Sequence, residues 1–80
     1  GEEFCVIYPE TSLAEAVKNS EKIKRFCSLR PISDHRIKQT VSGGVSAFPE
    51  TSSAEELLPD ADICLYKAKE AGRNKIIAKI

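Results

Sequence analysis

The sequence of 80 residues has no tryptophan or methionine, a single histidine, and no apolar run near the roughly 20 residues of a membrane span. We therefore expect no membrane-spanning segment. Its three cysteines, Cys5, Cys27 and Cys64, are odd in number, far apart and without a CxxC pair, which argues against a disulfide framework and a zinc site. We expect reduced thiols that act as small core residues in a cytoplasmic protein.

The sequence also has no excess of positive or negative charge, because twelve basic residues balance twelve acidic ones. No global field attracts nucleic acid or an anionic membrane, so we expect neither as a partner. Any anion-binding site must then be local. The hydrophobic fraction of 41% and the charged fraction of 30% are typical of a soluble globular protein.

The first 27 residues predict a strand followed by a helix. Residues 3–8 are rich in strand-forming side chains and end at Pro9, which cannot donate a ladder hydrogen bond. Ser12 and Glu15 have the spacing of a capping box, and apolar or small residues then recur at helical spacing. We expect a helix over residues 13–27.

The middle of the chain predicts one long strand over residues 37–48. Side chains alternate there between two faces, and an apolar stretch follows. The pair Gly43 and Gly44 is typical of a bulge or of close backbone approach. A polar loop precedes this strand, and residues 49–52 predict another loop after it.

The second predicted helix has the clearest pattern. Ser53 and Glu56 again have capping-box spacing, and Gly72 stands where a left-handed cap is expected. Pro59 costs about 3 kcal/mol in a helix interior. We therefore expect a kink, or a short turn before a main segment from about Asp60.

Residues 75–80 predict a short closing strand. The predicted order is strand, helix, strand, helix, strand, which favours a mixed α/β or α+β sheet with helices packed on it.

Two groups of residues could carry chemistry. Glu2 and Glu3 are adjacent carboxylates at the start of a strand, so they project to opposite faces, and such carboxylates can hold Mg²⁺. Lys69 and Arg73 are four residues apart and, if the helical turn persists, could grip a polyphosphate. Each group also has an ordinary interpretation: solvated surface charges for the glutamates, and cations that complement the helix dipole beside the Gly72 cap.

The order of three sequence blocks separates these alternatives. Residues 1–4, Gly-Glu-Glu-Phe, resemble the end of the signature of GGDEF-type diguanylate cyclases. Residues 40–46 resemble that family's central strand, and residues 61–74 resemble its closing helix motif. The resemblance covers essentially all of residues 1–80, which it identifies as the C-terminal part of a single GGDEF domain.

The resemblance implies a fold and a set of site residues. The fold is the palm-like α/β domain of nucleotide cyclases, with a ferredoxin-like core and an antiparallel-rich sheet flanked by helices. Glu2 matches the catalytic, metal-binding acid, and Glu3 the next acidic residue of the metal site. Gly1 matches a glycine at which backbone approaches the nucleotide. Lys69 and Arg73 match the pair that contacts the terminal phosphates.

The implied activity joins two GTP molecules into cyclic di-GMP with release of pyrophosphate, using two divalent cations, normally Mg²⁺. A homodimer presents the two nucleotides to each other, and an attached sensory or receiver domain controls it in a parent that can itself be membrane-anchored. Two alternatives stay open: a silent module that binds GTP or cyclic di-GMP and regulates an attached domain, and a folded piece with no activity of its own. We expect the isolated 80 residues to be inactive.

Overall fold

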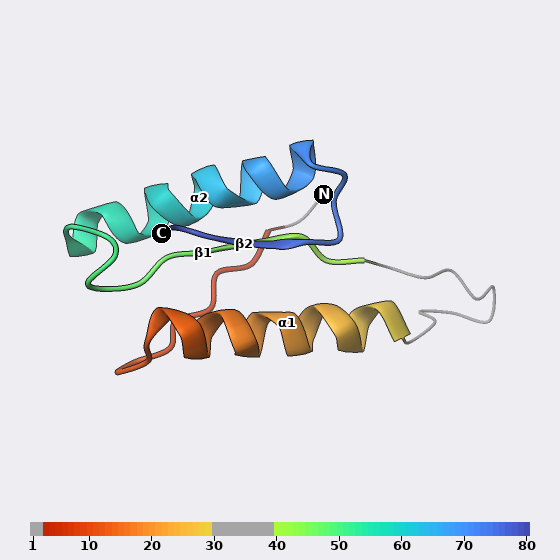
Figure 1. The fold of residues 1–80 in the computed structure, drawn as a ribbon, viewed down its shortest axis with the longest axis horizontal. Helices are drawn as coiled ribbons and strands as arrows, with labels where there is room; N and C mark the ends of the chain where they lie inside the picture. Colours follow the sequence, from red (N-terminus) through yellow and green to blue (C-terminus); the bar gives the residue numbers. More distant parts are fainter. Residues whose placement is uncertain (1–2, 30–39) are drawn as a thin grey trace.

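The computed structural model describes residues 3–29 and 40–80, and these ranges hold two helices and two strands (Figure 1). They are α1 (Leu13–Leu29), β1 (Gly43–Val45), α2 (Ala54–Glu70) and β2 (Ile76–Ala78). The strands lie between the two helices, and each helix contacts both strands. Within the described ranges no helix combines the length and apolarity that crossing a membrane requires.

The two strands pair in parallel, with Gly43 opposite Ile76 and Val45 opposite Ala78. Helix α2 connects them and returns the chain to the same end of the sheet, so that β1, α2 and β2 form a βαβ unit (Figure 1). The expected antiparallel-rich sheet is therefore wrong for the described residues. A helical crossover between adjacent strands requires the parallel arrangement.

Helix α1 begins as the sequence predicts. The Glu15 backbone N–H donates to the Ser12 hydroxyl at 3.2 Å, and the Ala16 N–H donates to the Ser12 carbonyl at 2.9 Å. The helix ends at Leu29, slightly beyond its predicted end. Ala16 is its buried residue.

The predicted strand over residues 3–8 is wrong. These residues form no strand pairing, and Phe4 and Ile7 are 86% and 81% exposed. A strand needs a neighbour that accepts and donates its backbone hydrogen bonds, and no described segment supplies one. The described order is thus helix, strand, helix, strand. Cys5 is exposed with this segment, whereas Cys64 is buried as expected.

The predicted long strand over residues 37–48 is much shorter where it is described. Residues 37–39 lie outside the described ranges, and the strand spans Gly43–Val45. The chain then turns: the Thr51 N–H donates to the Ala47 carbonyl at 2.8 Å, which confirms the predicted loop. The closing strand is likewise confirmed but shorter, Ile76–Ala78.

Helix α2 differs from prediction in its first half. The Ser53 side chain makes no capping hydrogen bond; its carbonyl instead accepts the Glu56 N–H at 3.1 Å, so this capping box is wrong. The helix also continues through Pro59 as one element rather than as a short turn and a main segment. Two hydrogen bonds hold this part of α2 on either side of Pro59. The Ser46 hydroxyl donates to the Leu57 carbonyl, and the Thr51 hydroxyl donates to Asp60 Oδ2 at 3.0 Å.

The core lies where β1 passes beneath α2. Val45, Ala47, Cys64 and Ala68 are buried there. The residues are small because the strand runs close to the helix backbone. A Cβ atom placed on Gly44 would lie 2.9 Å from the Cys64 carbonyl carbon and closer still to backbone atoms of α2. Only glycine permits this approach.

We predict that Gly44→Ala destabilises the fold by about 2 kcal/mol or more, because backbone atoms of α2 would have to move. Urea unfolding followed by circular dichroism measures the free energy of unfolding. Gly43→Ala is the matched control: its added Cβ would meet the Cδ1 methyl of Ile76, a flexible side-chain end that can rotate away. Equal losses of stability in the two variants would contradict the proposed close contact.

A second prediction concerns thiol reactivity. Burial raises the pKa of the Cys64 thiol above its ordinary value of 9.0, which lowers its thiolate fraction at any given pH. Cys64 is only 3% exposed, whereas Cys5 is exposed. In single-cysteine variants we expect a disulfide reagent at pH 8 to label Cys64 at least roughly tenfold more slowly than Cys5. Similar rates in the folded chain would show that the packing of β1 against α2 does not bury Cys64.

Candidate functional site

The structure brings together two of the residues that the sequence singled out. Gly1 and Glu2 lie outside the described ranges, whereas Glu3 is described. Its Oε2 atom lies 3.3 Å from Lys69 Nζ, although the two residues are 66 positions apart. Glu3 therefore lies beside the last turn of α2. A predicted metal-binding carboxylate and a predicted phosphate-binding cation form an exposed ion pair.

A shallow hollow of about 250 Å³ adjoins this ion pair. Besides Glu3 and Lys69, it is lined by Asp62, Leu65 and Tyr66. Asp62, Leu65 and Tyr66 were not predicted as site residues from the sequence. Their spacing could have indicated a shared site with Lys69, because positions 62, 65, 66 and 69 share one face of a helix.

Tyr66 presents a neutral hydroxyl beside this hollow. A hydrogen bond with the Glu70 carboxylate and, to a smaller extent, burial raise the pKa of the phenol above its ordinary value of 10.0. The phenol therefore keeps its proton at neutral pH and can act as a hydrogen-bond donor.

Arg73 lies beyond the end of α2, in a tight turn. The Arg73 N–H donates to the Ala68 carbonyl at 2.9 Å and the Gly72 N–H donates to the Lys69 carbonyl at 3.3 Å, the double closure of a Schellman motif. Gly72 has a φ of 110°, which confirms the predicted left-handed cap. The condition for Lys69 and Arg73 to share one side of the helix, that the helical turn persists, is not met, because α2 ends at Glu70 and Arg73 has a φ of 64°.

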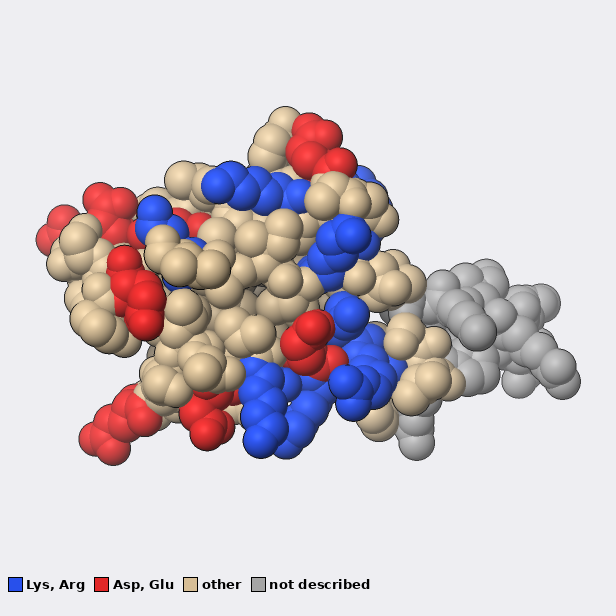
Figure 2. All heavy atoms as spheres, viewed as in Figure 1, with Lys and Arg blue, Asp and Glu red and all other residues tan. Residues whose placement is uncertain are grey.

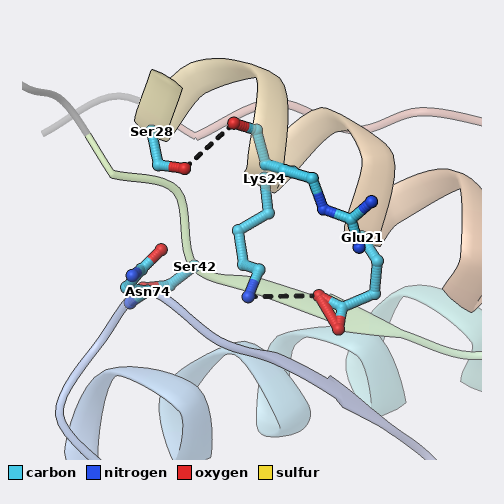
Figure 3. Close-up of polar contacts among 6 residues, drawn as sticks. Glu21, Lys24, Ser28, Ser42 and Asn74 are labelled. Atoms are coloured by element: carbon cyan, nitrogen blue, oxygen red, sulfur yellow. Dashed lines mark hydrogen bonds and ion pairs between the residues drawn. The ribbon is translucent and has the colours of Figure 1, made fainter. Parts of the chain in front are cut away.

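The turn contains a second non-glycine residue in the left-handed region, Asn74, with a φ of 52°. Each such residue costs on the order of 1 kcal/mol or more relative to ordinary backbone. Two contacts to the strand side hold the turn. The Asn74 N–H donates to the Ser42 hydroxyl at 3.0 Å, and the Gly43 N–H donates to the Lys75 carbonyl at 2.9 Å. Figure 3 shows Ser42 and Asn74 side by side.

The charges of the described residues are unevenly distributed. Acidic residues occupy the first turns of both helices, Glu15 in α1 and Glu55 with Glu56 in α2, and Lys67 and Lys69 occupy the last turn of α2. Figure 2 shows acidic side chains gathered at the end where the helices begin, and basic ones over α1 and toward the end of α2. Around Lys69 itself the charges are mixed, because Glu3 is paired with it and Asp62 lines the same hollow.

The described residues offer few ligands for a metal ion. Within residues 3–29 and 40–80, no cluster of three or more His, Cys, Asp or Glu side chains could hold one. Glu3 has the oxygen donor that Mg²⁺ prefers, and its carboxylate is exposed. The Glu3 carboxylate therefore fits a divalent cation, although it is paired with Lys69 in this structure. Further metal ligands would have to come from outside the described ranges.

Comparison with known proteins places the chain in a family. The model of the family described as "Diguanylate cyclase, GGDEF domain" matches residues 1–75. The response regulator PleD of Caulobacter vibrioides is 40% identical over 84 residues, which cover 99% of this chain and 18% of PleD. The diguanylate cyclase VdcA of Vibrio cholerae is 35% identical over 82 residues, covering 96% of this chain and 24% of VdcA.

The uncharacterized protein YhcK of Bacillus subtilis is 39% identical over 80 residues, covering 95% of this chain and 22% of YhcK. The chain thus spans about a fifth of the length of these relatives. The matched residues include the Gly-Glu-Glu-Phe segment, the glycine pair of β1 and the closing helix with its turn. This chain belongs to the GGDEF domain family of diguanylate cyclases.

Proposed function

We propose that the chain is the C-terminal part of a single GGDEF domain that joins two GTP molecules into cyclic di-GMP and pyrophosphate. The observation that carries the proposal is the 3.3 Å contact between Glu3 and Lys69. In a member of this family, this contact between Glu3 and the cation proposed to bind phosphate supports a shared site. Neither residue is needed there for stability, since exposed ion pairs contribute at most about 1 kcal/mol.

In the proposed reaction, the ribose 3'-hydroxyl of one GTP attacks the α-phosphorus of the other. The new O3'–P bond forms as the bond to the pyrophosphate leaving group breaks, and a second such step closes the ring. Lys69 and Arg73 bind the terminal phosphates, Lys69 as a point charge and Arg73 through its planar guanidinium. Gly1 leaves room for the nucleotide to approach the backbone.

The family uses metal ions for catalysis. Mg²⁺ would be held by Glu2, with Glu3 as a further carboxylate, and would neutralise the triphosphate and the leaving oxygen. Lys69 pairs with the Glu3 carboxylate. A triphosphate that took Lys69 as its partner would leave the Glu3 carboxylate available as a metal ligand.

The remaining parts of the site would come from outside these 80 residues. We propose that a homodimer brings two nucleotides together and that an attached sensory or receiver domain controls this assembly. PleD, which carries the name response regulator, is more than five times as long as the matched region, leaving room for such domains. Because these 80 residues would supply only part of the site, the isolated chain would bind GTP negligibly in calorimetric titration.

We predict that Glu2→Gln in the longer protein lowers cyclic di-GMP synthesis from GTP and Mg²⁺ by roughly a hundredfold or more, because the amide cannot supply the negative charge opposite the metal. Chromatographic quantification of the product measures the rate. Glu10→Gln is the matched control, since Glu10 is an exposed glutamate beyond the signature. Synthesis retained at the original rate in Glu2→Gln would remove Glu2 from the active site.

We also predict that Lys69→Ala raises the KM for GTP by roughly ten- to a hundredfold, the worth of a charge-assisted hydrogen bond, with a smaller change in kcat. Lys67→Ala is the control, because Lys67 carries the same charge in the same last turn of α2 but does not contact Glu3. The assignment of Lys69 to phosphate binding fails if both variants raise KM equally, since general electrostatics would then explain the effect.

A further inference from the structure

The turn after α2 is held in an unusual backbone conformation. Gly72, Arg73 and Asn74 follow one another with φ values of 110°, 64° and 52°. Glycine adopts such values freely, whereas arginine and asparagine persist there only when their surroundings determine the conformation. Arg73 owes its position beside the end of α2 to this turn, because the helix itself ends at Glu70.

The contacts that fix the turn come from two directions. On the helix side, the N–H groups of Gly72 and Arg73 donate to the carbonyls of Lys69 and Ala68. On the strand side, the hydroxyl of Ser42, directly before β1, accepts the Asn74 N–H at 3.0 Å. The other hydrogen bonds of the turn described here join backbone groups, whereas this one uses a side chain, so substitution can remove it cleanly.

We propose that Ser42 is a positioning residue that holds Arg73 in place for phosphate binding. This inference rests on the proposed function, in which Arg73 contacts the terminal phosphates of GTP. Ser42 itself touches no phosphate in this arrangement. It fixes the backbone of Asn74, so the backbone of the turn that carries Arg73 does not have to be ordered when the nucleotide binds.

Figure 3 contains a suitable control. Ser28 also uses its hydroxyl in a hydrogen bond to backbone, donating to the Arg25 carbonyl at 2.9 Å, but both residues belong to α1. Ser28 therefore matches Ser42 in side chain and in bonding to backbone, although the Ser28 hydroxyl donates and the Ser42 hydroxyl accepts, and the Ser28 bond stays within α1 rather than reaching the turn. The Lys24 and Glu21 side chains, paired at 3.4 Å, also lie on α1, and substitution of Ser28 or Ser42 removes neither partner of this ion pair.

The test uses the full-length protein and 3'-deoxyGTP with Mg²⁺, a nucleotide that can bind but lacks the attacking hydroxyl. Isothermal titration calorimetry gives its Kd. We expect Ser42→Ala to weaken binding about fivefold, within the range of one lost hydrogen bond, and Ser28→Ala to leave it unchanged. Ser42→Thr keeps the hydroxyl and should bind like the original protein, whereas its isostere Ser42→Val should behave like Ser42→Ala.

A double-mutant cycle with Arg73→Ala separates positioning from general stability. If Ser42 acts through Arg73, Ser42→Ala adds no further loss of affinity in the Arg73→Ala background. An equal loss in both backgrounds, or original affinity in both Ser42→Ala and Ser42→Val, overturns the inference while leaving the proposed function intact. Original affinity in Arg73→Ala alone overturns the phosphate-binding role of Arg73 and, with it, the role of Ser42.

Discussion

The close approach of β1 to α2 at Gly44 is the constraint on which the described structure depends. An added Cβ would lie within 2.9 Å of α2 backbone atoms, so the strand and helix pack backbone to backbone. The buried side chains around this contact are small, Ala68 and Cys64 among them. Because α2 is fixed at this point, its last turn and the Arg73 turn have a defined position over the strands.

Local patterns predicted the helices well and the sheet poorly. Helical periodicity, the Ser12 cap and the Gly72 cap are encoded within a few residues, and the structure confirms them. A strand depends on a neighbour distant in sequence. Residues 3–8 have strand-forming composition but no partner among the described residues, and the antiparallel expectation came from the family rather than from the chain. The connection itself, a helix between two strands, indicates a parallel pair.

The candidate site was predictable as a set of residue types but not as a geometry. The sequence gives no reason for Glu3 to meet Lys69 across 66 positions; that contact requires the start of the chain to lie beside the end of α2. Ser42 carries even less signal, because its hydroxyl meets a backbone N–H, and any residue except proline supplies that group. Contacts to backbone leave no complementary side chain to find in a sequence.

The exposure of the Glu3–Lys69 pair suits it to an exchange of partners. The Glu3 side chain is 61% exposed and that of Lys69 is 36% exposed, so water screens their attraction, and separating them costs at most about 1 kcal/mol. A triphosphate offers Lys69 several negative charges, and a divalent cation offers Glu3 twice the charge of an ammonium group. In the proposed reaction, each residue would therefore gain a stronger partner when nucleotide and metal bind. A buried pair at the same distance would resist this exchange, because separating it would leave an unpaired charge away from water.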